Sequence, residues 1–284
     1  MPILSESTRT LVDGLAFAEC LRWHDGRLYF SDMHAQRVLA VDMQGRAEVI
    51  CELDDRPGGL GWLPDGRLLV VAMTTRRLYR LDRDGLRVAA DLAPRVPWYL
   101  NDMAVDPRGN AYIGNIGFDY FGGEAFRPAT LWLVEPGGAM RPVADDVYSP
   151  NGPAITPDGR TLIVAESSAA RLTAFDIAAD GSLANRRIWA ELPGGVPDGI
   201  ALDGAGRVWS AMFGGKALWL SAEGRGVIAR HAIERDCYAC SVGGTDMRSL
   251  FVATATSHDP EECRRLLGGR IEIMRIDAAS NVVE

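Results

Sequence analysis

Four residues with side-chain oxygens, Glu19, Asn101, Asn151 and Asp198, stand in similar surroundings although they are far apart in the chain. Each begins an apolar run that ends in a short polar turn. Carboxylate and amide oxygens suit a hard divalent ion, so Ca²⁺ is the first expectation, with Mg²⁺ or Mn²⁺ as alternatives. No His or Cys is a clear ligand, which makes Zn²⁺ less natural as the native metal, although its affinity would let it substitute.

A local explanation competes for single positions, because Asn and Asp often cap turns by bonding the nearby backbone. Glu has no such turn role, so the same placement of Glu19 favours a shared cause. Two acids and two amides gathered in one place would repel and be poorly solvated without a cation. The set therefore predicts one metal site, provided that the fold brings these residues together.

The elements that would do so are six similar hairpins. Each joins a turn rich in Asp, Pro and Gly to a β-rich run, and the turns recur every ~40–50 residues, as in repeat folds. The hairpins contain "WHDGRLYFSDM", "LPDGRLLVVAM", "DPRGNAYIGNI", "TPDGRTLIVAES", "DGAGRVWSAMF" and "GTDMRSLFVATA". A third alternating run follows each hairpin, and a fourth follows five of them. The segment "TRTLVDG" near the N-terminus supplies the missing strand.

This repetition predicts an all-β, six-bladed β-propeller with four antiparallel strands per blade, in which the N-terminal strand closes the last blade. Residues 1–284 are expected to form one propeller domain. A β-sandwich with coincidental turn spacing is the alternative. The segment 259–269 is expected to add one or two helical turns within a loop.

In a propeller the first strand of each blade lines the central channel, so equivalent positions form a ring. Counting back from each hairpin turn gives Glu19, Gly58, Asn101, Asn151, Asp198 and Cys240. The last residues of the second strands return to the same face. Among them, Asp32 and Glu166 are interpreted either as partners that orient the ligands or as solvated strand ends.

Composition narrows the function further. The formal net charge of -8 argues against nucleic acid or an anionic membrane as partner. No apolar stretch approaches the ~20 residues of a membrane helix, and no signal-like N-terminus is present, so a soluble, cytoplasmic protein is expected. The five cysteines suit a reducing compartment, and Cys237 and Cys240 of "CYAC" are expected to be buried thiols.

Four segments carry a family resemblance: "AECLRW", "NDMAVDPRGN", "SPNGPAITPDGRTLIVAE" and "VPDGIALDGAGRVW". They resemble the gluconolactonase, regucalcin (senescence marker protein) and luciferin-regenerating-enzyme family over about residues 10–277. The resemblance implies a six-bladed propeller with one divalent metal in its channel and, in most members, lactonase activity. It also implies metal ligands at Glu19, Asn151 and Asp198.

The same resemblance implies that Asn101 contacts the substrate and that an acidic contact lies near Asp119. Tyr99 stands where regucalcin-like sugar lactonases carry an arginine, so a more apolar substrate than an aldonolactone is expected. The insertion 117–130 is interpreted as a lid, with a surface Ω-loop as the alternative. The residues expected to contact substrate are Tyr99, Asn101, Phe118, Asp119, Tyr120 and Met212, and Met73 and Phe213 would add apolar surface.

The predicted function is a metal-dependent lactonase, which opens a cyclic ester by attack of water. The metal would polarise the carbonyl, and Asp198 is the candidate general base. The partner would be a small lactone or ester. The sequence contains no GxSxG nucleophile elbow, no P-loop and no GxGxxG motif between a strand and a helix, so none of these motifs indicates another chemistry. Two alternatives remain open: hydrolysis of another ester or a phosphotriester, and a non-catalytic metal-containing binding propeller. Surface or structural roles are expected for His24, His34, His231 and His258.

Overall fold

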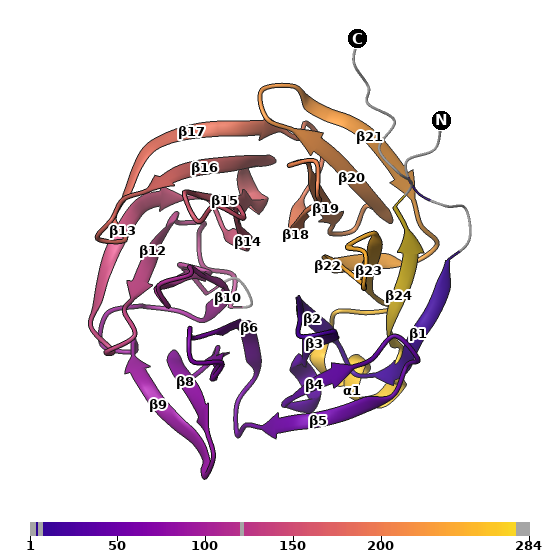
Figure 1. Ribbon diagram of the computed structural model, residues 1–284, viewed down its shortest axis with the longest axis horizontal. Helices are drawn as coiled ribbons and strands as arrows, with labels where there is room; N and C mark the ends of the chain where they lie inside the picture. The colour runs from indigo at the N-terminus through magenta and orange to yellow at the C-terminus, as the bar shows by residue number, and fades with distance from the viewer. Residues whose placement is uncertain (1–3, 5–7, 120–121, 277–284) are drawn as a thin grey trace.

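Six four-stranded antiparallel sheets surround a central channel in the computed structural model, which describes Leu4, residues 8–119 and residues 122–276 (Figure 1). This confirms the predicted six-bladed propeller. The first three blades are β2 (Ala18–His24), β3 (Arg27–Asp32), β4 (Arg37–Val41) and β5 (Ala47–Glu52); β6 (Pro57–Trp62), β7 (Leu68–Ala72), β8 (Arg77–Asp82) and β9 (Gly85–Asp91); and β10 (Leu100–Val105), β11 (Ala111–Asn115), β12 (Ala129–Val134) and β13 (Met140–Val147).

The next two blades follow the same order from the channel outward. They are β14 (Pro150–Ile155), β15 (Thr161–Glu166), β16 (Arg171–Ile177) and β17 (Leu183–Glu191); and β18 (Pro197–Leu202), β19 (Val208–Met212), β20 (Ala217–Ala222) and β21 (Gly226–Ala232). Two 3₁₀ turns, Met33–Ala35 and Ser167–Ala169, follow the second strands of their blades.

The last blade joins the two ends of the chain, as predicted. Its strands are β22 (Asp236–Gly243), β23 (Ser249–Ala255), β24 (Gly269–Arg275) and, outermost, β1 (Arg9–Leu15). Antiparallel pairing runs from Arg9 opposite Ile273 to Leu15 opposite Gly269. The closed ring leaves no long unpaired sheet edge between its first and last blades.

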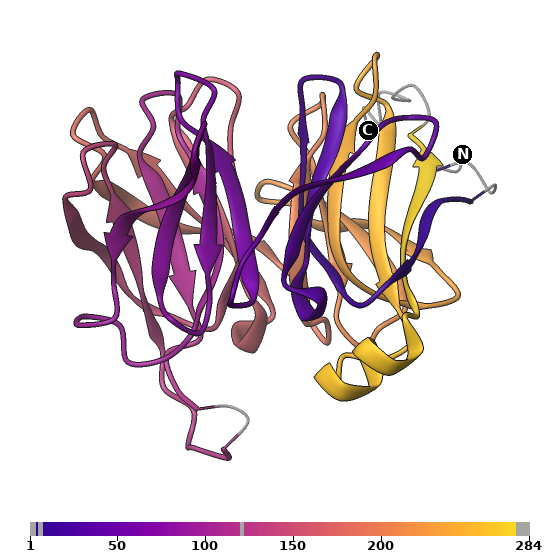
Figure 2. The same ribbon diagram turned by 90° about the horizontal axis from the view of Figure 1, so that it is seen from below.

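A helix, α1 (Pro260–Leu266), lies between β23 and β24 and confirms the helical turns expected within 259–269. The side chain of Asp259 caps its N-terminus by accepting from the backbone of Glu261 and Glu262. Figure 2 places this helix on the same face of the ring as the insertion between β11 and β12. Across the described ranges, no helix has the length and apolar character needed to span a bilayer.

The innermost strands of adjacent blades pack so closely around the channel that some positions have no room for a side chain. A Cβ on Gly59 would lie 2.3 Å from the backbone nitrogen of Met103, and one on Gly199 would lie 2.6 Å from the Cα of Ala239. Glycine at these two positions lets adjacent blades approach backbone to backbone. The ring residues are therefore held at short range from one another.

Candidate active site

The channel face that carries α1 opens into a cavity of about 620 Å³. Glu19, Asn101, Asn151 and Asp198 all line this cavity, each from the first strand of a different blade. The structure thus brings together the four oxygen-bearing residues that the repeat predicted. This volume falls in the range of sites for small organic molecules.

A bulge in each first strand positions these side chains. The pairing of β2 with β3 shifts between Glu19 and Arg22, and comparable shifts follow Asn151 in β14 and Pro197 in β18. A bulge bends the strand and re-aims a side chain. The repeated irregularity at the channel therefore accounts for several polar side chains pointing to one centre while the rest of each strand packs against its neighbours.

The two carboxyl groups are almost completely buried: Glu19 is 8% exposed and Asp198 is 7% exposed. Burial, followed by the charge of Asp198, raises the pKa of Glu19 well above its ordinary value. Burial and the charge of Asp102 raise the pKa of Asp198 to about 8, against a hydrogen bond from Asn151 that lowers it. Negative charge is costly at this centre unless a cation compensates it.

Hydrogen bonds to Asp198 and to the backbone orient the two amide side chains, and a backbone N–H holds Glu19. Asn151 donates through Nδ2 to Oδ1 of Asp198, and its Oδ1 accepts from the backbone of Gly152 at 3.0 Å. Asn101 donates through Nδ2 to the carbonyl of Pro150 at 3.2 Å. The backbone N–H of Cys20 donates to Oε2 of Glu19 at 3.0 Å.

The donor set fits a hard divalent ion held by few protein ligands. Among the described residues no cluster of three or more His, Cys, Asp or Glu side chains has the geometry of a metal site. The two carboxyls and the amide oxygen of Asn151 are the kind of oxygen atoms that Ca²⁺ and Mg²⁺ accept as ligands. Within the described part of the chain neither carboxyl forms an ion pair, and Arg22 pairs with Asp102.

The acids at the strand ends, Asp32 and Glu166, are fully buried, and their carboxylates bind backbone and arginine groups beside the cavity. Asp32 accepts from the backbone of Phe17 at 2.8 Å and from Arg37 at 2.9 Å. Glu166 accepts from the backbone of Tyr148 at 2.8 Å and from Arg171 at 3.0 Å. These bonds hold the chain just before Glu19 and Asn151, so neither acid is a solvated strand end.

The sixth ring position was assigned wrongly to Cys240. In the structure, Cys237 lies opposite Thr254, which places Tyr238 at the ring position, and Tyr238 lines the cavity. Cys240 lies deeper and lines the opposite end of the channel. The reason is that β22 and β23 continue farther toward their turn than the other hairpins, so a fixed count back from the turn falls two residues short.

Both cysteines of "CYAC" are buried free thiols, as expected.

Apolar and aromatic side chains form most of the remaining wall. Tyr99, Phe118, Met73 and Phe213 line the cavity as predicted, and Phe126 of the insertion joins them. Asp119 does not line it; its carboxylate accepts from the backbone of Gly122 within the insertion. Met212 is also absent from the wall, because it is buried in the core between blades. Tyr120 lies outside the described residues.

Three basic residues of the wall, His34, Arg56 and His258, lie outside the repeated positions. His34 stacks on Phe17 with ring centroids 5.0 Å apart. Burial, reinforced by the charge of Arg56, lowers the pKa of His34 to about 4, so the imidazole is neutral near pH 7. All three come from connections beside the strands, where no repeat marks them. For His34 and Arg56 the only sequence signal is the residue type, whereas the place of His258 in a late loop allowed it to reach the channel mouth.

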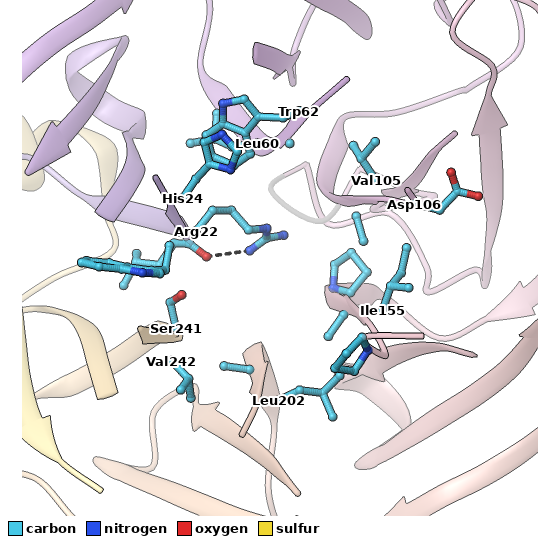
Figure 3. Close-up of a pocket in the computed structure, with 18 of the residues that line it drawn as sticks. Arg22, His24, Leu60, Trp62, Val105, Asp106, Ile155, Leu202, Ser241 and Val242 are labelled. Carbon is cyan, nitrogen blue, oxygen red and sulfur yellow. Dashed lines mark hydrogen bonds between the residues drawn. The ribbon is translucent and has the colours of Figure 1, made fainter. Parts of the chain in front are cut away.

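The opposite mouth of the channel is also hollow, with a volume of about 700 Å³ (Figure 3). Arg22 projects into it, and its guanidinium donates to Asp102 at 2.7 Å and to the carbonyls of Leu21 and Met103. Most of the surrounding side chains are apolar. The labelled apolar residues in Figure 3 are Leu60, Trp62, Val105, Ile155, Leu202 and Val242.

Comparison with known proteins agrees with the geometry. The family described as SMP-30/Gluconolactonase/LRE-like region matches residues 17–256. A pentonolactonase from Haloferax volcanii is 28% identical over 256 residues, 87% of this chain and 84% of that protein. A 6-deoxy-6-sulfogluconolactonase from Pseudomonas putida is 28% identical over 255 residues, 86% of this chain and 85% of that protein.

Among solved structures, a regucalcin from Agrobacterium tumefaciens, described as a calcium-binding protein, superposes with a TM-score of 0.79. The superposition covers 95% of this chain and 94% of that one at 21% identity, and supports the fold. The family match covers most of the chain, including all four oxygen-bearing ring residues. The chain belongs to the SMP-30/gluconolactonase/LRE-like family.

Proposed function

We propose that this protein is a metal-dependent hydrolase that opens a lactone in the 620 Å³ cavity. One observation carries the proposal: the buried carboxyls of Glu19 and Asp198 line one apolar-walled cavity together with Asn151, which donates to Asp198. Two relatives that are each 28% identical over most of the chain are named as lactonases, which supports the same reaction class.

Glu19, Asn151 and Asp198 would hold the metal ion, and Ca²⁺ suits their oxygen atoms best. When bound, such an ion supplies Lewis-acid polarisation of the ester carbonyl. The raised pKa values of Glu19 and Asp198 support this assignment, because buried carboxyls resist ionisation until a cation neutralises them. Binding of the ion would therefore release protons from this pair near neutral pH.

The protein groups have separable tasks in the reaction. Asp198 would orient the attacking water and accept its proton as general base. Asn101 lies at the same ring and would hydrogen-bond the lactone. Tyr99 and Phe118 would cover the ring of the substrate and limit access of bulk water. Asp119, Tyr120 and Met212 are weaker candidates for substrate contact, since the described wall does not include them.

The deciding experiment measures proton release from a panel of lactones by chelated protein to which Ca²⁺, Mg²⁺, Mn²⁺ or Zn²⁺ is restored singly. Asp198→Asn should reduce turnover by about 10²–10⁴-fold, the usual contribution of a general base. Asn151→Ala should raise the metal concentration needed for activity. Asp25→Asn is the matched control, because it removes an exposed carboxylate at the other mouth of the channel.

Calorimetry of metal binding completes the test. Metal-restored turnover that is lost in Asp198→Asn but kept in Asp25→Asn would support the lactonase. Stoichiometric metal binding with no turnover of any lactone would overturn it. In that case a phosphotriester panel would separate another hydrolase from a binding propeller.

A further inference from the structure

One arginine, Arg56, stands in the cavity wall and has no anionic partner among the described residues. Arg56 is the only Arg or Lys among the described residues that line the 620 Å³ cavity. Within the described ranges, no ion pair or side-chain hydrogen bond involves its guanidinium, whereas many other arginines are paired with Asp or Glu. A guanidinium carries five donors in a planar fork and binds carboxylates in a bidentate manner.

The backbone of Arg56 is fixed from both sides. Its N–H donates to Oδ1 of Asp55 at 2.6 Å, and its carbonyl accepts from the backbone of Met73 at 3.0 Å. Asp55 is 5% exposed, and Thr74 and Thr75 also donate to its carboxylate. The nearest acid in sequence is therefore engaged in holding the backbone and does not neutralise the Arg56 side chain.

Neither His34 nor Glu124, both in the cavity wall, forms an ion pair with Arg56. His34 is 6% exposed, and its Nδ1 has no hydrogen-bond partner within the described part of the chain. The charge of Arg56 is one of the causes that lower the pKa of His34, so the two side chains lie within electrostatic reach. Glu124, the acid at the insertion side, is held by Arg127 at 2.6 Å and by the backbone of Asp119 at 2.8 Å.

We propose that Arg56, with His34 beside it, forms a subsite for an anionic group of the substrate, so that the preferred lactones carry a carboxylate or a similar oxyanion away from the reacting ester. The inference rests on the proposed lactonase and specifies its substrate class. It also gives a role to a charge that the ring-opening chemistry does not use. The ester would lie at Asp198 and the anion at Arg56, and the apolar wall would cover the segment between them.

The test uses γ-butyrolactones that bear a carboxylate on an arm of zero, one or two carbons, each paired with the primary amide of the same arm. Both members of a pair have nearly the same size and differ in charge. The wild-type protein should prefer the carboxylate at its best arm length. In Arg56→Gln the ratio of kcat/KM for carboxylate over amide should fall by about 10- to 100-fold, mainly through KM, which is typical for the loss of a charged hydrogen bond.

Arg56→Lys should restore part of the preference, because it keeps the charge and loses the fork. Arg95→Gln is the matched control, since Arg95 is exposed and lies outside the cavity, and it should leave the ratio unchanged. An equal loss for carboxylates and amides in Arg56→Gln, or a wild-type protein with no preference for either, would overturn the subsite.

A binding measurement separates this inference from the proposed reaction. Cyclopentanones with the same carboxylate and amide arms lack the ester and cannot be opened. Calorimetry should show tighter binding of the carboxylate to the wild-type protein and a loss of that difference in Arg56→Gln. If no lactone is turned over but this difference is found, the lactonase fails and the anion subsite stands. If turnover is found without the difference, the subsite fails alone.

Discussion

The two mouths of the channel are hollows of similar size but of different chemistry. The mouth near α1 has about 620 Å³ and contains buried carboxyls together with Arg56, which forms no ion pair with any residue that the structure describes. The opposite mouth has about 700 Å³, and its buried charges are paired: Arg22 with Asp102, and Asp106 with Arg108. In the larger hollow these charges are thus already neutralised by partners within the protein.

Five of the six innermost strands, all except β6, contribute residues to both hollows, so the contrast arises along each strand. Polar ring residues precede the bulge, and apolar residues such as Leu60, Ile200 and Val242 follow it. Volume alone would favour the opposite mouth as a binding site. Uncompensated charge favours the mouth near α1, because a group that is buried and unpaired in the protein gains most from a ligand or ion.

The strongest test of this contrast removes the pair that separates the two hollows. Arg22→Met should lower the free energy of unfolding by about 3 kcal/mol, because it leaves the buried carboxylate of Asp102 without its partner. Urea denaturation measures the loss. The double variant Arg22→Met/Asp102→Leu should recover much of it. A single variant as stable as the wild-type protein would show that this ion pair does not stabilise the fold.

The pH dependence of stability should reveal the charge at the mouth near α1. The pKa of Asp198 is raised to about 8 from 3.8, so the folded protein binds this proton more tightly than the unfolded chain. Stability of the chelated protein should therefore fall as pH rises from about 4 to about 8, by up to ~1.4 kcal/mol per pH unit for one such carboxyl. Glu19 acts in the same direction.

Denaturation of chelated protein at pH 5, 6, 7 and 8 measures that slope, and added Ca²⁺ should stabilise the fold more at pH 8 than at pH 5. Asp198→Asn should flatten the dependence. A flat profile in the wild-type protein would mean that burial does not raise the pKa of these two carboxyls.

The apolar wall should affect substrate binding more than the reaction step. Phe126 is 43% exposed, lines the cavity and packs edge-on against Phe118 at 5.4 Å. Phe126→Ala should raise KM for lactones with an apolar substituent about 5- to 10-fold, near 1 kcal/mol, with kcat within about 2-fold. Ile188→Ala, at an exposed site outside the cavity, is the control. A change in kcat alone would contradict the assignment.

The smallest effect is expected at the opposite mouth. His24 stacks on Trp62 there, with ring centroids 3.9 Å apart. His24→Ala should cost about 0.5–1 kcal/mol of stability, the usual range for such a ring pair, and leave kcat/KM within about 2-fold. Steady-state kinetics beside a thermal melt checks both. A kinetic loss of tenfold or more would give the opposite mouth a part in the reaction.

Repetition in the sequence explains which parts of this picture were predictable. Glu19, Asn101, Asn151 and Asp198 were found because they occupy one position in a repeated hairpin, and symmetry carried them to one axis. The same reasoning placed Cys240 where Tyr238 stands, since the β22–β23 hairpin is longer than the others. Counting back from the turn identifies the ring position only when the hairpins have the same length.

The cavity wall obeys no such rule. Arg56, His34 and His258 lie in connections whose lengths differ from blade to blade, and their convergence depends on tertiary packing. Met212 illustrates the opposite case, because it is correctly placed at a strand end and yet turns into the core between blades. For Met212 the sequence pattern located the backbone and left the direction of the side chain undetermined.

Closure of the last blade by β1 also has a consequence for the order of folding. Five blades consist of strands that follow one another along the chain, so each can assemble from local hairpins as soon as it is synthesised. The sixth must wait until Gly269–Arg275 can reach Arg9–Leu15, across nearly the whole sequence. Such a distant contact is entropically costly to form and is expected to come late. During synthesis the protein should therefore exist as an open ring of blades, whose exposed first and last edges are the segments most in need of protection from other chains.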